Sequence, residues 1–214
     1  MTCFFTACDA VKRVEATDYL LTENSFFING EKKKSEELTN LSFQKKNTSF
    51  LGAPLGLHIY NLARPHKDSI FKAWLQKNPK RKQRLISKLS EKQLNQLKTS
   101  AIGFNRWLKN TGEAPVLLDS LKINKTKLNL ERYYFANGWF DRTVNYKVET
   151  VGLKRAALKF EIETGTPYSI GSLSERIDSP VIDTLYKNLK QGSHLKIEDQ
   201  FKISNFDSER KRLT

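Results

Sequence analysis

The segment from Glu131 to Gly165 places the strongest constraint on the fold, because it combines a helix end with a β-hairpin. Apolar and polar side chains alternate over 143–148 and again over 156–163, the period of two that is typical of half-buried strands. The apolar positions are Val144, Tyr146 and Val148 in the first run and Ala156, Leu158, Phe160 and Ile162 in the second. We expect both sets to face a core, since an isolated hairpin needs a helix on its apolar face to be stable in water.

The residues before the hairpin predict that helix. Ile123, Leu130 and Tyr134 recur at helical spacing, and Gly138 follows the last turn, where a left-handed cap is favoured. We interpret the surrounding motif as structural, with a glycine that turns the chain and rings that pack. Its members are Tyr133, Tyr134, Gly138, Trp139, Phe140 and Gly165. A helix on a hairpin indicates an α+β fold rather than a parallel-sheet enzyme.

Further elements are expected on both sides of this unit. A strand is predicted over Tyr19 to Asn29, where Asn29-Gly30 marks a turn, and Ser35 is expected to cap a short helix. Ser90 and Gln93 form a capping box that begins a long helix ending at Gly112. Segments within 35–62 and over 121–137 already provide the helices that would pack on the sheet. Residues of about 64–113, which include a short helix predicted over 68–76, are therefore interpreted as a helical insertion.

The same order begins again after Gly165. A strand is predicted over Tyr168 to Ile177, a helix beginning at Ser179-Pro180, and a further helix capped by Ser204. The order β-α-α-β-β therefore occurs once in full and once without its closing hairpin, which is an internal repeat. The predicted division is 1–16 as the remnant of a lipoprotein signal and a linker, 17–165 as the first domain, and 166–214 as an incomplete second domain of marginal stability.

The charge balance favours anionic partners. The 214 residues hold 37 Lys and Arg against 23 Asp and Glu, a formal net charge of +14. One basic run has no acidic residue and consists of Lys77, Lys80, Arg81, Lys82, Arg84 and Lys88. It has no interleaved aromatic residues of the kind that stack on single-stranded nucleic acid, so we expect no nucleic-acid partner and interpret the run as a basic surface.

No pattern indicates catalysis, a cofactor or a metal. His58, His66 and His194 lack metal-ligand spacing, and the chain has no Gly-rich phosphate loop. Both cysteines, Cys3 and Cys8, lie at the extreme N-terminus, which excludes a disulfide scaffold or a cysteine-ligated zinc site in the body. We therefore expect no catalytic residues.

Thr6-Ala7-Cys8 looks like the end of a bacterial lipoprotein signal, with Cys8 as the acylated residue. The alternative is a disordered terminus with two incidental cysteines. Outside this terminus, no segment approaches the roughly 20 apolar residues of a membrane span.

Three motifs carry a family resemblance: LGAPLGLHIYNLA at 51–63, TGEAP at 111–115, and YYFANGWF at 133–140, which leads into a hairpin ending in EIETG. With the element order above, the chain resembles polypeptide-transport-associated (POTRA) repeats of the BamA/TamA superfamily, and most closely the TamL-like lipoproteins of Bacteroidetes. The resemblance covers nearly the whole chain. Such family members continue through further repeats into a membrane β-barrel.

The resemblance implies a periplasmic arm attached to the outer membrane through an acylated Cys8. Its partners would be unfolded outer-membrane protein clients or subunits of an assembly complex. In such repeats the first strand of the hairpin lies at the sheet edge and binds an extended segment by β-augmentation. The corresponding residues here are Arg142, Thr143, Val144, Asn145, Tyr146, Lys147 and Val148.

Two further expectations concern the charges at this edge and an alternative function. Arg142 and Lys147 are expected to discourage pairing between two copies of the edge. The competing interpretation is a lipid-anchored basic module that binds a membrane surface, or scaffolds a complex, without handling clients.

Overall fold

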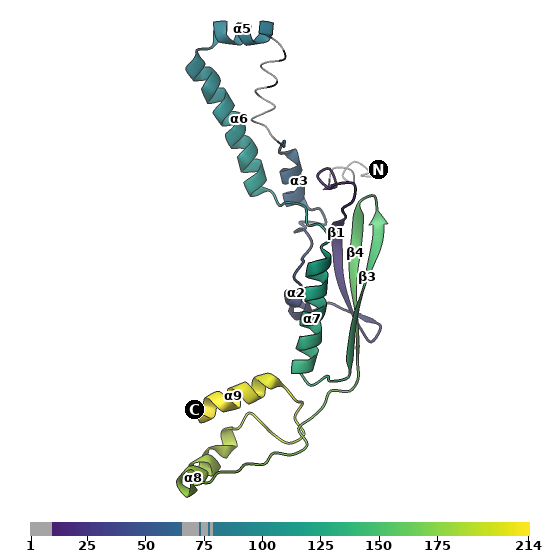
Figure 1. The fold of residues 1–214 in the computed structure, drawn as a ribbon, viewed down its shortest axis with the longest axis vertical. Coiled ribbons are helices and arrows are strands. Elements are labelled where there is room, and N and C mark those ends of the chain that lie inside the picture. The colour runs from purple at the N-terminus through teal and green to yellow at the C-terminus, as the bar shows by residue number, and fades with distance from the viewer. Residues whose placement is uncertain (1–9, 66–72, 74–76, 78) are drawn as a thin grey trace. The chain divides into compact units, whose positions relative to one another are not determined.

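The structure is a computed structural model that describes residues 10–65, 73, 77 and 79–214 (Figure 1). Contacts divide the chain into two compact units. Unit 1 comprises Met1–Thr22, Lys45–Leu118 and Thr150–Ala156, and unit 2 comprises Glu23–Gln44, Asp119–Glu149 and Ala157–Thr214. In this division residues 166–214 group with most of the hairpin before them, and the domain boundaries expected from the sequence stay a prediction.

The described strands form one mixed sheet with the order β2-β1-β4-β3. The strands are β1 (Leu20–Ile28), β2 (Glu31–Lys33), β3 (Arg142–Gly152) and β4 (Arg155–Thr164). β1 and β2 pair antiparallel across Asn29 and Gly30, whose φ angles of 50° and 84° fit the two-residue turn that this dipeptide favours. The predicted α+β class is confirmed.

β1 and β4 run parallel. The N–H of Leu20 donates to the carbonyl of Lys154, and the N–H of Asn29 donates to the carbonyl of Ile162, each at 2.9 Å. From the first bond to the second, the residue number rises in both β1 and β4, so the two strands run in the same direction. β3 pairs only with β4 among the described strands and therefore lies at the sheet edge.

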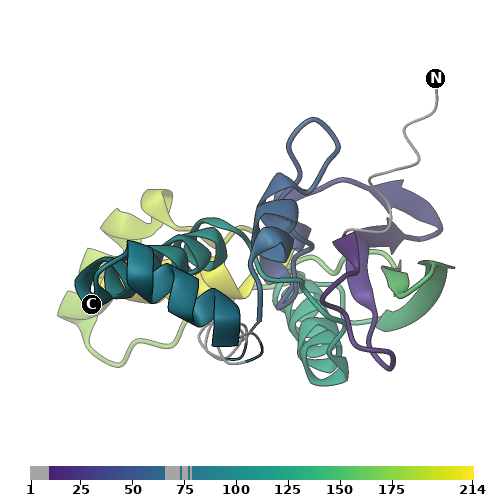
Figure 2. The ribbon, with the colours of Figure 1, turned by 90° about the horizontal axis from the view of Figure 1, so that it is seen from above.

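In unit 2, α2 (Glu36–Leu41) packs against α7 (Ser120–Ala136), and α7 lies along one face of the strands (Figures 1 and 2). The predicted cap at Ser35 is present, since its hydroxyl accepts a hydrogen bond from the N–H of Leu38. The buried side chains here include Phe26, Leu130, Tyr134, Val144, Leu158, Phe160 and Ile162. Most of the apolar positions expected to form the hairpin core are thus buried.

Unit 1 holds α3 (Leu55–Leu62), α5 (Pro79–Lys88) and α6 (Glu91–Thr111), in which α6 contacts both other helices. The capping box of Ser90 and Gln93 is confirmed, and Gly112 ends α6 as expected. A side chain at Gly112 would collide with the backbone nitrogen of Tyr60, which explains why the helices can approach so closely there. The short helix predicted over 68–76 lies almost entirely outside the described residues.

The C-terminal part of unit 2 contains α8 (Pro180–Leu189), a 3-10 turn (Lys190–Gly192) and α9 (Ile203–Leu213). The strand predicted over 168–177 is wrong: this segment forms only an isolated bridge, from Ser169 to Gln200. Its backbone is instead hydrogen-bonded to the loop before α9. The N–H of Ile170 donates to the carbonyl of Asp199 at 2.9 Å. Ser204 does not cap α9, because that helix begins at Ile203 and its N-cap residue is Lys202, two residues before Ser204.

Candidate functional site

The edge strand β3 has one polar face that is tied to β4 by two cross-strand ion pairs. The ammonium of Lys147 lies 2.8 Å from the Glu161 carboxylate, and that of Lys159 lies 2.6 Å from Glu149. The hydrogen bond to Glu161 raises the pKa of Lys147 above its usual value. These exposed pairs contribute little free energy but fix the polar side chains on one side of the hairpin.

The opposite face of β3 is apolar and only partly covered. Val144 is 1% exposed, whereas Tyr146 and Val148 are 37% and 46% exposed. The ring of Tyr146 lies 6.4 Å from that of Phe160, which is completely buried. The expectation that all three β3 side chains face the core is therefore wrong for Tyr146 and Val148. We call residues Thr143 to Val148 the edge strip.

Arg142, at the start of β3, also has a role that was not expected. Its Nε donates to the carbonyl of Glu131 at 2.9 Å, and Nη1 donates to the carbonyl of Phe140 at 3.0 Å. Its guanidinium also lies 4.8 Å from the ring centroid of Phe135. Arg142 thus binds the carboxyl end of α7, where a cation is favourable, and whether its charge also discourages edge pairing stays a prediction.

The motif at 133–140 forms a junction between α7, β3 and the C-terminal segment. Gly138 has φ of 90°, and a Cβ there would lie 2.7 Å from the carbonyl oxygen of Phe201. The ring of Trp139 packs on Tyr134 at 5.5 Å, while Phe140 contacts the rings of Phe135, Tyr168 and Phe201 at 5.1 to 5.2 Å. The motif residues contact one another and the C-terminal segment, which gives them a structural role.

Backbone and phenol contacts reinforce this junction. The N–H of Tyr168 donates to the carbonyl of Gly138 at 2.8 Å, and the N–H of Gly165 donates to the carbonyl of Asp141 at 2.9 Å. Burial, with a hydrogen bond to Glu37 of α2, raises the pKa of Tyr133 to about 12. Burial also raises the pKa of Tyr134 to about 12. Both phenols therefore stay neutral near pH 7.

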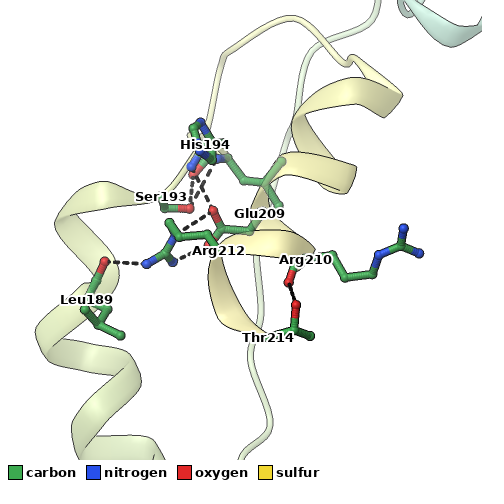
Figure 3. Close-up of polar contacts among 8 residues, drawn as sticks. Leu189, Ser193, His194, Glu209, Arg210, Arg212 and Thr214 are labelled. Carbon is green, nitrogen blue, oxygen red and sulfur yellow. Dashed lines mark hydrogen bonds and ion pairs between the residues drawn. The ribbon is translucent and has the colours of Figure 1, made fainter.

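A buried carboxylate at Glu209 joins α9 to the end of α8 (Figure 3). Glu209 is 6% exposed and accepts hydrogen bonds from the backbone N–H of His194, at 2.9 Å, and from the guanidinium of Arg212. Arg212 also donates to the carbonyl of Leu189 at 3.0 Å. Hydrogen bonding from Arg212 is the largest cause that lowers the pKa of Glu209 to about 2.

The sequence did not predict this contact between Glu209, Arg212 and the backbone of His194. Glu209 and Arg212 are three residues apart on a helix, a spacing typical of an ion pair, but the same spacing is common on solvated helix faces. His194 contributes only its backbone N–H to this contact, so its side chain does not indicate the contact in the sequence. The Glu209 carboxylate oxygens accept from donors of the chain itself, and the cluster connects α9 to the segment after α8.

The motifs at 51–63 and 111–115 contact each other within unit 1. The N–H of Glu113 donates to the carbonyl of Gly56 at 2.8 Å, and the Glu113 carboxylate accepts from the N–H of Thr48 at 2.9 Å. Beside them lies a pocket of about 340 Å³. Its apolar lining includes Leu20, Leu21 and Leu57, and its polar lining includes Lys46, Asn47, Ser49, His58 and Arg155.

The remaining candidates fall partly outside the described residues. Cys8 lies outside them, and so do the side chains of Arg81 and Lys82. Lys77, Lys80, Arg84 and Lys88 are exposed. Within the described ranges, no three His, Cys, Asp or Glu side chains gather closely enough to hold a metal ion. No helix in that part of the chain is long and apolar enough to cross a membrane.

Comparisons with protein-family models, with curated proteins and with solved structures find no match for this chain.

Proposed function

We propose that this chain is a polypeptide-binding module that takes up an extended segment as an additional strand at β3. In this proposal it is a POTRA-like arm of an outer-membrane protein assembly factor, held in the periplasm by an acylated Cys8. Unfolded outer-membrane proteins or subunits of the assembly complex would supply the added strand. The observation that carries the proposal is the edge position of β3, combined with its half-exposed apolar face.

The backbone of β3 would supply most of the affinity for an added strand. An edge strand presents a row of N–H and C=O groups without strand partners, and an extended peptide can satisfy them whatever its sequence. Selectivity would come from Tyr146 and Val148, because alternate side chains of the added strand meet them on the same face. Lys147 lies on the opposite face and is engaged by Glu161, so it leaves the apolar face open.

The order of the elements along the chain also supports the proposal. β1, α2, α7, β3 and β4 follow the order β-α-α-β-β, with β2 added after β1 and with α3, α5 and α6 inserted between α2 and α7. β1 pairs with β4 and not with β3, which leaves the first strand of the hairpin at the edge. An edge position for this strand is what strand capture requires.

The test is a titration of the full chain, labelled with ¹⁵N, with a peptide of about ten residues that alternates apolar and polar side chains, the pattern of outer-membrane strands. Amide signals of the edge strip are expected to shift and gain protection from exchange. Replacing both Tyr146 and Val148 by serine should weaken binding by about tenfold or more, because two apolar contacts are lost. Leu128→Ser, on the exposed side of α7, is the matched control and should leave binding unchanged.

Unchanged amide signals over 143–148 at saturating peptide would refute the proposal. Shifts confined to another element would do the same, since the added strand must contact β3.

A further inference from the structure

Helices α5 and α6 hold most of the excess positive charge of the chain. Residues 77–111 contain ten Lys and Arg but only one acidic residue, Glu91, so this segment has a net charge of +9 out of +14. In the part of this segment whose side chains the structure describes, none of the cations is paired with a carboxylate. They are Lys77, Lys80, Arg84, Lys88, Lys92, Lys98, Arg106 and Lys109.

The pairing is different elsewhere in the chain. Lys32, Lys147, Lys159, Lys187 and Lys190 each lie within 2.8 Å of a carboxylate oxygen. The described cations of α5 and α6 are thus concentrated in one segment without carboxylate partners, whereas each of these five lysines has one. Such a surface attracts a polyanion or an anionic interface.

The same helix α6 also carries an exposed apolar stripe. Leu97, Phe104 and Trp107 are 51%, 57% and 54% exposed. Their spacings of seven and three residues place them on one side of the helix. The rings of Phe104 and Trp107 stack at 5.7 Å with 21° between their planes. Leu108, four residues after Phe104, and Asn105 are buried, so the exposed stripe borders the part of α6 that packs against α3.

We propose that α5 and α6 bind the surface of an anionic lipid bilayer. Leu97, Phe104 and Trp107 enter the boundary between headgroups and acyl chains, and the flanking cations contact anionic headgroups. A helix with an apolar stripe, interfacial aromatic rings and a basic remainder is suited to lie in this plane. The charge of the segment is complementary to such a surface. This inference goes beyond strand capture at β3 and does not depend on it.

A single-stranded nucleic acid is the competing polyanion, and the geometry favours it less. Bases stack on the faces of aromatic rings, but Phe104 and Trp107 already cover one face of each other. Leu97 offers no stacking surface, whereas an acyl boundary accepts aliphatic and aromatic groups alike.

The test is co-flotation of the full chain with vesicles of phosphatidylcholine that contain about 30% phosphatidylglycerol, compared with vesicles of phosphatidylcholine alone. Binding is expected only to the anionic vesicles, and it should weaken as salt is raised, because headgroup attraction is screened. Tryptophan emission should shift to shorter wavelength on binding, and Trp107→Phe should remove most of that shift.

Variants separate the stripe from the charge. The double variant Phe104→Ser with Trp107→Ser should lose at least about tenfold in vesicle affinity, since interfacial binding scales with buried apolar area. Leu121→Ser removes an exposed leucine of α7 and should bind like the unmodified chain. Reversing Lys98, Arg106 and Lys109 to glutamate should abolish binding. Unchanged far-ultraviolet circular dichroism would show that α6 remains folded in each variant.

Several results would overturn the inference: no binding to anionic vesicles, equal binding to both vesicle types, or full binding by the Phe104→Ser, Trp107→Ser variant. Preference for a single-stranded oligonucleotide over the vesicles, lost in that variant, would assign the surface to nucleic acid instead. Peptide-induced shifts in the edge strip should be the same in the unmodified chain and in these variants, so failure here is distinguishable from failure of strand capture at β3.

Discussion

Among single residues, Gly138 has a backbone conformation that favours glycine, and the space around it leaves no room for a side chain. Its φ of 90° is strained for side chains other than glycine, and a Cβ would lie 2.7 Å from the carbonyl oxygen of Phe201. We expect Gly138→Ala to lower the free energy of unfolding by about 2 kcal/mol or more, from backbone strain and the steric clash together. Urea denaturation measures the loss. Gly171→Ala, in open space, is the control, and an equal effect in both variants would contradict the argument.

Glu209 gives a residue-scale prediction for pH. Its pKa is about 2 in the folded chain, below the ordinary 4.5, so its contribution to stability is complete above pH 4.5 and is lost as pH falls toward 2. The chemical shift of the His194 amide, which donates to this carboxylate, should titrate with a midpoint near 2. Replacing Arg212 by glutamine should move that midpoint toward 4.5. A midpoint near 4.5 in the unmodified chain would show that the pair is not formed.

Residue identity predicted conformation better than it predicted exposure. Asn29, Gly30, Ser35, Ser90 and Gln93 act locally, through φ angles or hydrogen bonds within a few residues, and each was predictable. The exposure of Tyr146 and Val148 was not, because alternation only assigns a side chain to a face. Whether that face is covered depends on where α7 packs, and this is set by contacts distant in sequence.

At the scale of elements, the same distinction separates correct from wrong predictions. The helices α6 and α7 have apolar residues at helical spacing over several turns, which fixes their type from the sequence. β2 was missed because Glu31–Lys33 is short and fully polar, so only its pairing with β1 makes it a strand. The strand expected over 168–177 is absent although its residues suit a strand, because its backbone is hydrogen-bonded to a loop and not to a neighbouring strand.

The cap of α6 supplies an element-scale prediction. The Ser90 hydroxyl accepts from the N–H of Gln93, and the Gln93 side chain accepts from the N–H of Ser90 at 2.9 Å. Ser90→Ala should lower helix stability by about 1 kcal/mol, because a terminal N–H loses its partner. Amide exchange over the first turn of α6 would rise, while exchange near its carboxyl end, next to Gly112, should stay unchanged. Exchange that is unaltered in the first turn would contradict this role of the cap.

At the scale of the whole molecule, stability is expected to differ along the chain, and residues 166–214 should be its weakest described part. α8 has no buried residue, and its apolar side chains Val181, Ile182, Leu185 and Leu189 are all exposed. Few buried contacts mean a small free energy of local opening. Hydrogen exchange should therefore be about a hundredfold faster in α8 than in α7, whose Ile123, Leu130 and Tyr134 are buried. Leu185→Ser should leave the exchange of α8 unchanged, because its side chain is already exposed. Protection in 166–214 that is uniformly as strong as in α7 would contradict the prediction, since it would require a contact for α8 that its exposed face does not provide.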